Sequence, residues 1–427
     1  MSNAFLNATE YANSMLLLAK NLLVTGRLVD GKFKDQVTDE NGLIINIKRP
    51  PRFVAGSGAA LSAQDIVTGS TSVSVNQYTN VHLQIGDLES VQSFNALMRN
   101  SSMRSAAQTL ASQIDSYLQG LVLGFHGWCT SAGHAANPAV NIGNVQTLMA
   151  AHTRLMENGV PLVDIAGTCA PVDGELIRGA MLTNFTPDEN VTALERARIP
   201  VVSEIDWYAT QQTPAMTTGT RTNGAVNGAA QNVNYRSVKS TNTQTIAVNG
   251  LGAGGTIAAG EVFTIAGVFA WDWRANGGAG AVLPYLQQFT ATSGATADGT
   301  GAVAALTISP PIIVQGTSDG VSTTANTAFA TVNSIPASAA VVTWVGAAST
   351  ALRVRAAWTK SAIQLVSARL QTPFTGVASF ATDPETGISI RYWRGSDITT
   401  GNHIHRWDCI YGATNVDAFM GTRVSAY

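Results

Sequence analysis

Charged side chains are scarce in this sequence. Lysine and arginine together number 25 and aspartate and glutamate 27 in a chain of 427 residues, so charged residues make up 12% of it, whereas an ordinary soluble domain carries about 25%. The net charge of −2 excludes a freely basic nucleic-acid coat and an acidic tail. Because 45% of the residues are hydrophobic, intrinsic disorder is excluded as well. A long chain with so few charges suggests that neighbouring protein covers much of its surface, as in the subunit of an assembly.

Cysteine and long apolar runs are also scarce. Cys129, Cys169 and Cys409 lie far apart and cannot all pair, so the chain is not a disulfide scaffold. No stretch approaches the roughly eighteen apolar residues of a membrane-spanning helix, and the first residues lack the basic leader of a signal peptide. We therefore expect synthesis in the cytosol and no membrane partner.

Three segments show the hydrophobic spacing of a helix: residues 9–24, 102–123 and 142–157. The second is the strongest, because six apolar side chains recur every three or four positions along it. These are Met103, Ala107, Leu110, Ile114, Tyr117 and Leu121. Over the whole segment the helix forms a rod of about 33 Å.

Strand patterns surround these helices. LIINIK (43–48) and TSVSV (71–75) bracket Pro50, Pro51 and the GSG of 56–58, and their connection is too long for an ordinary hairpin, so a large projecting loop is expected. Near the end of the sequence, GISIRYWRGSD and IHRWDCIYGA are predicted to be the two strands of a hairpin.

The composition changes abruptly between residues 241 and 352. This stretch is rich in Gly, Ala, Thr, Ser and Val and shows short β runs separated by Gly-rich turns, which is typical of a small barrel or sandwich. Its charged side chains are only Glu261, Asp272, Arg274, Asp298 and Asp319. The pattern predicts an all-β module inserted into an α/β host.

Motifs that could carry chemistry are weak. GLGAGG (250–255) matches G-x-G-x-x-G, but a β pattern follows it, where a dinucleotide site requires a helix, so we interpret it as a turn and predict no cofactor. Two groups of possible metal ligands match no standard zinc spacing, and packing is the favoured interpretation of both. They are His126, Cys129 and His134, and His403, His405 and Cys409. No catalytic motif is recognisable, so neither catalytic nor metal-binding residues are predicted.

The order of several segments along the chain gives a further indication of fold and function. The segments that matter are QDIVTGSTSVSVNQYTNVHLQI, SAAQTLASQIDSYLQGL, LMAAHTRLMENGVP, GEVFTIAGV, LQQFTAT, ISPPIIV, AAWTKSAIQLV and IHRWDCIYGA. In this order they resemble the major capsid proteins of tailed double-stranded DNA phages, which have the HK97-like fold. The closer resemblance is to the coat protein family of Salmonella phage P22, whose members carry a β-barrel insertion. The FAWDW of 269–273 and the Gly-rich loop of 275–281 depart from this pattern and leave the contacts at the tip of the insertion open.

The resemblance implies an α+β capsid fold with an inserted all-β barrel. The expected parts are an N-terminal arm (1–40), an extended β loop (41–86), the spine helix with the first part of the α/β body (87–239), the inserted barrel (240–345) and the remainder of the body (346–427). The arm and the β loop show no self-contained core, so we expect both to be mobile in free subunits.

The function implied is that of a major capsid protein, not an enzyme, which self-assembles into the icosahedral shell enclosing a tailed phage's double-stranded DNA genome. Its implied partners are copies of itself in pentamers and hexamers, a scaffolding protein, the portal and packaged DNA contacted non-specifically. It would be made in the bacterial host cytoplasm and reside in the virion capsid. The alternative is a β-rich tail, decoration or host-binding protein of a phage; an oxidoreductase using GLGAGG is a more distant one.

One basic cluster stands out in the first hundred residues: Lys48, Arg49 and Arg52, set around two prolines on the projecting loop. We predict that these residues contact carboxylates of an adjacent subunit. The alternative is a solvated turn, since isolated surface charges contribute only about 0–1 kcal/mol. On the contact hypothesis, Arg49→Glu with Arg52→Glu should impair assembly and leave the melting of the monomer unchanged.

Overall fold

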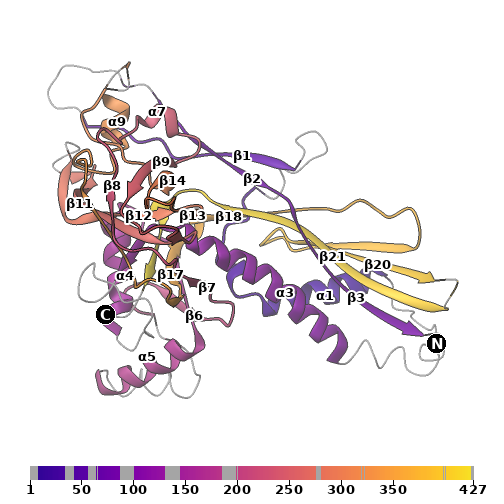
Figure 1. The fold of residues 1–427 in the computed structure, drawn as a ribbon. Helices are drawn as coiled ribbons and strands as arrows, with labels where there is room; N and C mark the ends of the chain where they lie inside the picture. Colours follow the sequence, from indigo (N-terminus) through magenta and orange to yellow (C-terminus); the bar gives the residue numbers. More distant parts are fainter. Residues whose placement is uncertain are drawn as a thin grey trace. The chain divides into compact units, whose positions relative to one another are not determined.

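In the computed structural model the chain forms two compact units (Figure 1). Unit 1 comprises Met1–Ile47, Ser72–Gly120 and Ile363–Thr414, and unit 2 comprises Lys48–Thr71, Leu121–Ala362 and Asn415–Tyr427. The structure describes residues 8–33, 43–55, 64, 66–86, 101–129, 145–184, 199, 201–275, 280–318, 320–321, 323–397, 399 and 401–424.

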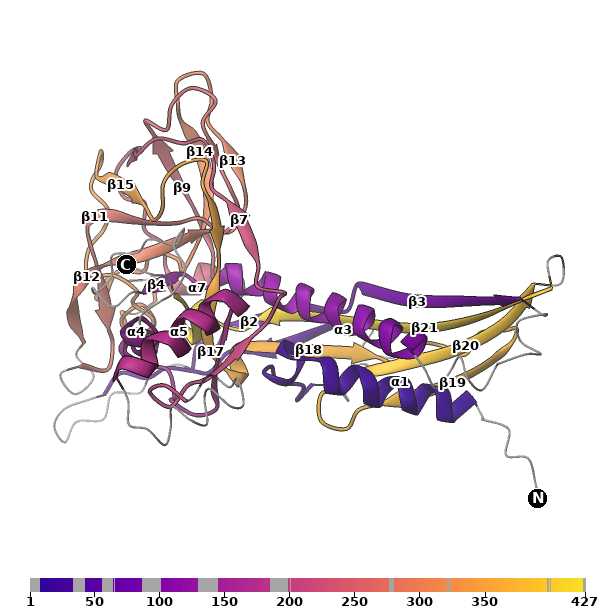
Figure 2. The same cartoon turned by 90° about the horizontal axis from the view of Figure 1, so that it is seen from below.

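Unit 1 is a long sheet accompanied by two helices. The sheet has the order β18-β21-β20-β19, and β3 pairs with β21. Its strands are β3 (Gln77–Gly86), β18 (Ile363–Ala368), β19 (Val377–Thr382), β20 (Ser389–Asp397) and β21 (Asn402–Asn415). The predicted hairpin is confirmed, because β20 and β21 pair antiparallel from Ile390↔Cys409 to Asp397↔Asn402. Figure 2 shows α1 (Ala8–Leu22) running along β19 and β20.

The predicted spine helix is α3 (Ser101–Leu121), extended by a 3-10 turn, η3 (Val122–Gly124). The predicted apolar face is confirmed for Met103, Ala107, Leu110 and Ile114, which are buried. Toward the end of the helix the predicted Tyr117 and Leu121 are half-buried, and Leu118 is buried in their place.

Residues 8–30 of the N-terminal arm pack on other parts of unit 1, and the mobility of the arm in free subunits stays a prediction. α1 buries Tyr11, Ala12, Met15 and Ala19. Beyond it, the 3-10 turn η1 (Thr25–Arg27) is held by the spine helix, since the Asp115 carboxylate accepts the backbone N–H of Val24 at 2.8 Å and of Gly26 at 2.9 Å. These contacts join residues about ninety positions apart, which local spacing does not reveal.

The two strands of the projecting loop pair with each other. β1 (Ile44–Lys48) and β2 (Ser70–Ser74) form a two-stranded sheet. Ile45 and Ile47 pack against Val73 and Val75 in a small apolar cluster that also contains Val366 of β18. The bases of the loop are therefore packed in a cluster that β18 completes, and the mobility of the loop in free subunits stays a prediction. Residues 56–63 lie outside the described residues.

The body in unit 2 is built on a five-stranded sheet of order β4-β22-β17-β5-β6. The strands are β4 (Gly127–Cys129), β5 (Ile165–Cys169), β6 (Asp206–Ala209), β17 (Arg355–Thr359) and β22 (Gly421–Val424). The helix α5 (Pro171–Asn184) connects the parallel strands β5 and β6, and α4 (Val145–Glu157) packs on the same core.

The inserted module is a closed six-stranded barrel with the order β11-β12-β14-β9-β8-β15. Its strands are β8 (Gly224–Val226), β9 (Gln244–Asn249), β11 (Val262–Asp272), β12 (Ala281–Ala291), β14 (Val303–Ser309) and β15 (Val341–Trp344). Phe263, Phe289 and Leu306 fill its interior and are fully buried. Because β8 lies before residue 240, one strand of the barrel falls outside the predicted range of 240–345.

Short elements complete unit 2. They are β7 (Ala215–Thr217), α7 (Tyr235–Val238), β10 (Thr256–Ile257), β13 (Ala295–Thr296), α9 (Thr324–Ala328), β16 (Ala351–Arg353), η4 (Lys360–Ala362) and η5 (Ala418–Met420). GLGAGG connects β9 to β10, so a strand follows the glycines and the segment is a turn, as interpreted from the sequence.

The barrel should fold alone when all six strands are present. A fragment of residues 218–350 is expected to give a β-type circular dichroism spectrum and one cooperative melt. A fragment of residues 240–345 lacks β8, which pairs with both β9 and β15, so its barrel is open and its melting midpoint should be roughly 5–15 °C lower. Identical melts would show that β8 contributes nothing to closure.

Candidate functional site

Arg49 is the buried member of the predicted basic cluster. Its side chain is 9% exposed. Nε donates to Thr71 Oγ1 and to the Val416 carbonyl, both at 2.9 Å, and Nη1 donates to the Lys239 carbonyl at 3.1 Å. Burial lowers the pKa of this guanidinium. Arg49 therefore ties the base of the projecting loop to two distant segments of unit 2, and the alternative of a solvated turn is wrong for this residue.

Arg52 lies at the edge of a cavity of about 230 Å³ in unit 2. Its guanidinium lies 3.6 Å from the Asp417 carboxylate and stacks over Trp273 and Phe329, at 5.5 and 5.3 Å from their ring centroids. Asp417 also caps η5, because its Oδ1 accepts the Phe419 N–H at 3.1 Å. Arg52 is thus half-buried and already has a carboxylate of its own chain, whereas Lys48 is exposed.

The three predicted contact residues therefore share one segment but not one environment. Lys48 faces solvent, Arg52 lines a cavity and Arg49 is an internal tie. The intersubunit contact itself stays a prediction. Because Arg49 is buried, Arg49→Glu is no longer expected to leave the melting of the monomer unchanged.

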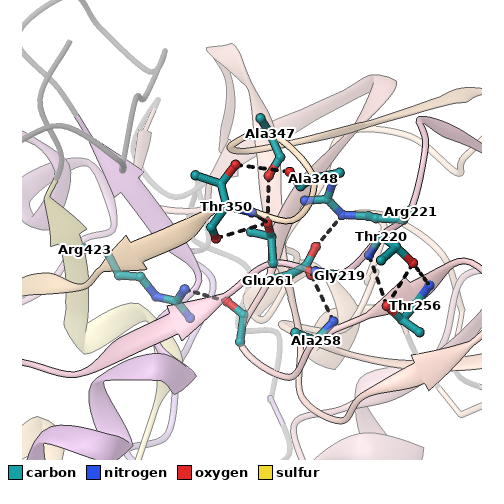
Figure 3. A network of polar contacts seen from close by, with 12 residues as sticks. Gly219, Thr220, Arg221, Thr256, Ala258, Glu261, Ala347, Ala348, Thr350 and Arg423 are labelled. Carbon is teal, nitrogen blue, oxygen red and sulfur yellow. Dashed lines mark hydrogen bonds and ion pairs between the residues drawn. The ribbon is translucent and has the colours of Figure 1, made fainter.

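The sequence reasoning missed a buried polar network where the barrel meets the body (Figure 3). Glu261, 1% exposed, accepts hydrogen bonds from the backbone N–H of Gly219, from Nε of Arg221 and, at 2.9 Å, from the N–H of Ala258. The Arg221 guanidinium also stacks on Trp344, 4.5 Å from the ring centroid. Glu261 is one of only five charged side chains in 241–352, and a carboxylate in so apolar a stretch is either exposed or paired. The scarcity of charged side chains in this stretch is the sequence feature that could have indicated a buried, paired carboxylate at Glu261.

Arg423 on β22 forms the other half of this junction. It is 0% exposed, and its two terminal nitrogens donate to the carbonyls of Gly260, at 2.6 Å, and Leu123. The guanidinium lies 5.5 Å from the centroid of the Trp128 ring. Among the described residues no carboxylate pairs with it, and burial lowers its pKa to about 9. Nothing in the sequence pattern around Arg423 distinguishes it from an exposed arginine.

Four of the possible metal ligands, two in each group, are buried. His126 Nδ1 donates to the Ala418 carbonyl at 3.0 Å and Cys129 Sγ to the Arg423 carbonyl at 3.2 Å, while His134 lies outside the described residues. His405 and Cys409 are buried, whereas His403 is half-buried and its Nδ1 lies 2.8 Å from the Ser396 hydroxyl. The part of the chain that the structure describes holds no group of three His, Cys, Asp or Glu side chains suited to a metal ion, and none of its helices is long and apolar enough to span a membrane.

Comparison with known proteins identifies the family. The model of the P22 coat protein (gene protein 5) matches residues 7–424. Similar solved structures include one of Mycobacterium phage Che8, at 11% identity over 94% of this chain and 90% of that chain, with a TM-score of 0.44. Others are the capsid of Cyanophage P-SCSP1u (10% identity, 100% and 90% covered, TM-score 0.44) and that of Ralstonia phage GP4 (7% identity, 100% and 92% covered, TM-score 0.39). No curated protein matches the chain.

The family match spans nearly the whole chain and includes the spine helix, the body and the closed barrel. It confirms the resemblance inferred from the sequence and disfavours the alternative of a tail, decoration or host-binding protein. The chain therefore belongs to the P22 coat protein family and is a major capsid protein, which self-assembles into the icosahedral shell of a tailed bacteriophage.

Proposed function

We propose that this coat protein is made in the bacterial cytoplasm, assembles around a separate scaffolding protein, incorporates a portal and encloses double-stranded DNA without enzymatic activity. The observation that carries the proposal is the family match over residues 7–424. Low charge supports it, because a net charge of −2 provides no excess of cations for tight binding to phosphates, and non-specific enclosure needs none.

The barrel is proposed to contact neighbouring subunits. It has its own apolar core and still exposes large apolar side chains, at Val282 (52%), Val321 (70%), Ile335 (41%) and Val341 (52%). Apolar side chains exposed on a subunit are candidates for burial in its interfaces. The family assignment makes copies of the same chain their simplest partner.

The end of β1 and the segment that follows it are proposed to contribute a second contact, through Lys48 and Arg52. Lys48 is exposed, and Arg52 keeps about a fifth of its side chain in solvent next to Asp417. Pro50 and Pro51 restrict the backbone between them, which reduces the entropy lost on docking.

Two substitutions separate this contact from the internal tie. Lys48→Glu should leave the melting of the monomer unchanged and slow assembly, whereas Arg49→Met should lower the free energy of unfolding by about 1–3 kcal/mol, because two buried carbonyls lose their donor. Thermal melts of monomers and light scattering during assembly provide the two readouts. Assembly of Lys48→Glu at the parent rate, at equal protein and salt concentrations, would count against the contact.

Assembly with and without the scaffolding protein of the same phage tests the proposed partner. Purified monomers mixed with it should give shells of uniform size, and monomers alone should give few or irregular particles. Uniform shells from the coat protein alone would show that no separate scaffold is required.

A further inference from the structure

The barrel is connected to the body of unit 2 by a two-stranded neck. β7 and β16, which lie just outside the barrel strands, pair antiparallel from Ala215↔Arg353 to Thr217↔Ala351. Thr218 continues the pairing, since its N–H donates to the Thr350 carbonyl at 3.0 Å and its hydroxyl to the Ala347 carbonyl at 2.7 Å. A two-stranded ribbon holds its ends together but is weak on its own, so further contacts must set the tilt of the barrel.

Such contacts lie beside the neck. Glu261, at the start of β11, binds this barrel strand to the segment between β7 and β8 through Gly219 and Arg221. From the body, Arg423 reaches the Gly260 carbonyl, one residue before Glu261 (Figure 3). The neighbouring strand β12 is held as well, because Gln288 exchanges two hydrogen bonds with the backbone of Trp128, at 2.6 and 3.2 Å. Arg423 stacks on this same tryptophan.

Arg423 is a costly way to build a stable core. Its cation is completely buried, and it is met by two neutral carbonyls and an aromatic ring. Burial of a cation without a carboxylate costs free energy, and its hydrogen bonds to the two carbonyls offset only part of that cost. Stability alone is therefore a weak reason for an arginine at this position. The arginine instead fixes the relative orientation of two segments, because its planar guanidinium binds a carbonyl of each at fixed angles.

We propose that Arg423 is a positioning residue, which fixes the orientation of the inserted barrel on the capsid body so that neighbouring subunits meet it in one pose. The importance of that pose for assembly rests on the proposed role of the barrel in intersubunit contacts. The positioning itself does not depend on that role.

Distance measurements between spin labels test the positioning directly. Labels are placed through Ser293→Cys on an exposed hairpin of the barrel and Glu175→Cys on the exposed side of α5 in the body. The native cysteines are buried, and burial raises the pKa of Cys129 to about 11 and of Cys169 and Cys409 to about 12, so they react poorly with the label at neutral pH. Pulsed electron paramagnetic resonance then reports the distribution of barrel–body distances.

Arg423→Met should broaden this distribution by about twofold or more, because several tilts become populated. Its melting midpoint should fall by about as much as that of Arg49→Met, because each substitution leaves two buried carbonyls without their donor, while the yield of regular shells falls. Arg353→Met is the matched control, since Arg353 lies in the neck with its side chain exposed, and it should leave all three readouts unchanged. Arg423→Lys, which keeps the charge but lacks the planar fork, should give an intermediate width.

A distribution as narrow in Arg423→Met as in the parent would overturn the proposal. So would equal broadening in Asp173→Asn, which breaks a buried ion pair with Arg355 within the body, because the broadening would then follow from lost stability alone. Broadening with normal shells would support the positioning role and contradict the proposed role of the barrel in assembly, so the two failures are distinguishable.

Discussion

Replacing Asp173 by asparagine is expected to lower the free energy of unfolding by about 3–5 kcal/mol, since it breaks a buried ion pair and leaves one partner charged. Arg355 Nε donates to Asp173 Oδ2 at 2.7 Å and Nη2 to Oδ1 at 2.9 Å, with both side chains at most 1% exposed. Oδ2 also accepts the Ala170 N–H at 3.1 Å and so caps the start of α5. The asparagine keeps the shape of the side chain but supplies no charge opposite Arg355.

Chemical unfolding of the monomer measures this loss. Glu175→Gln is the control, because it removes a carboxylate from an exposed position of the same helix and should change the free energy of unfolding by less than about 0.5 kcal/mol. The double variant Asp173→Leu with Arg355→Met should recover most of the loss, since no unpaired charge remains. Equal unfolding curves for Asp173→Asn and Glu175→Gln would contradict this account of the pair.

Mild acid should destabilise both units through two buried histidines. Burial, reinforced by the nearby charge of Arg154, lowers the pKa of His126 in unit 2 to about 3, and burial lowers that of His405 in unit 1 to about 4. An unfolded histidine titrates near pH 6.5. Below that pH the unfolded chain binds a proton that the folded chain does not, so stability is complete above pH 6.5 and is lost as the pH falls toward the folded pKa.

The expected slope is about 1.4 kcal/mol per pH unit for each histidine, or about 2 kcal/mol each between pH 6.5 and pH 5. Urea unfolding at pH 7 and pH 5 measures it, and His126→Gln and His405→Gln should each show a smaller loss between the two pH values than the parent. His82→Gln, at an exposed position of β3, is the control and should retain the parent's pH dependence. A parent-like pH dependence in the two buried variants would mean that these histidines are not the source of the acid sensitivity.

Local pattern predicted the elements well. The spine helix followed from apolar spacing between Met103 and Leu121, and the β20–β21 hairpin followed from two β-rich runs separated by a short turn. The barrel followed from a Gly-rich, almost uncharged stretch, but its strand β8 was missed because three residues, Gly224–Val226, are too few to show alternation.

The missed features are long-range polar contacts. Arg49 is buried only because Lys239 and Val416 lie next to it, 190 and 367 positions along the chain. Asp115 holds Val24 from 91 positions away. Arg423 meets the Gly260 carbonyl across 163 positions. A single sequence gives hydrophobic period and turn chemistry, but it does not say which distant backbone groups a buried charge will find.

The most direct test of the capsid assignment is cryo-electron microscopy of particles assembled from the purified chain with its scaffolding protein. We expect closed icosahedral shells whose subunits show a long helix over residues 101–121 and a separate closed barrel formed by strands between residues 224 and 344. Fibres, tail-like tubes or only monomers under the same conditions would contradict the account.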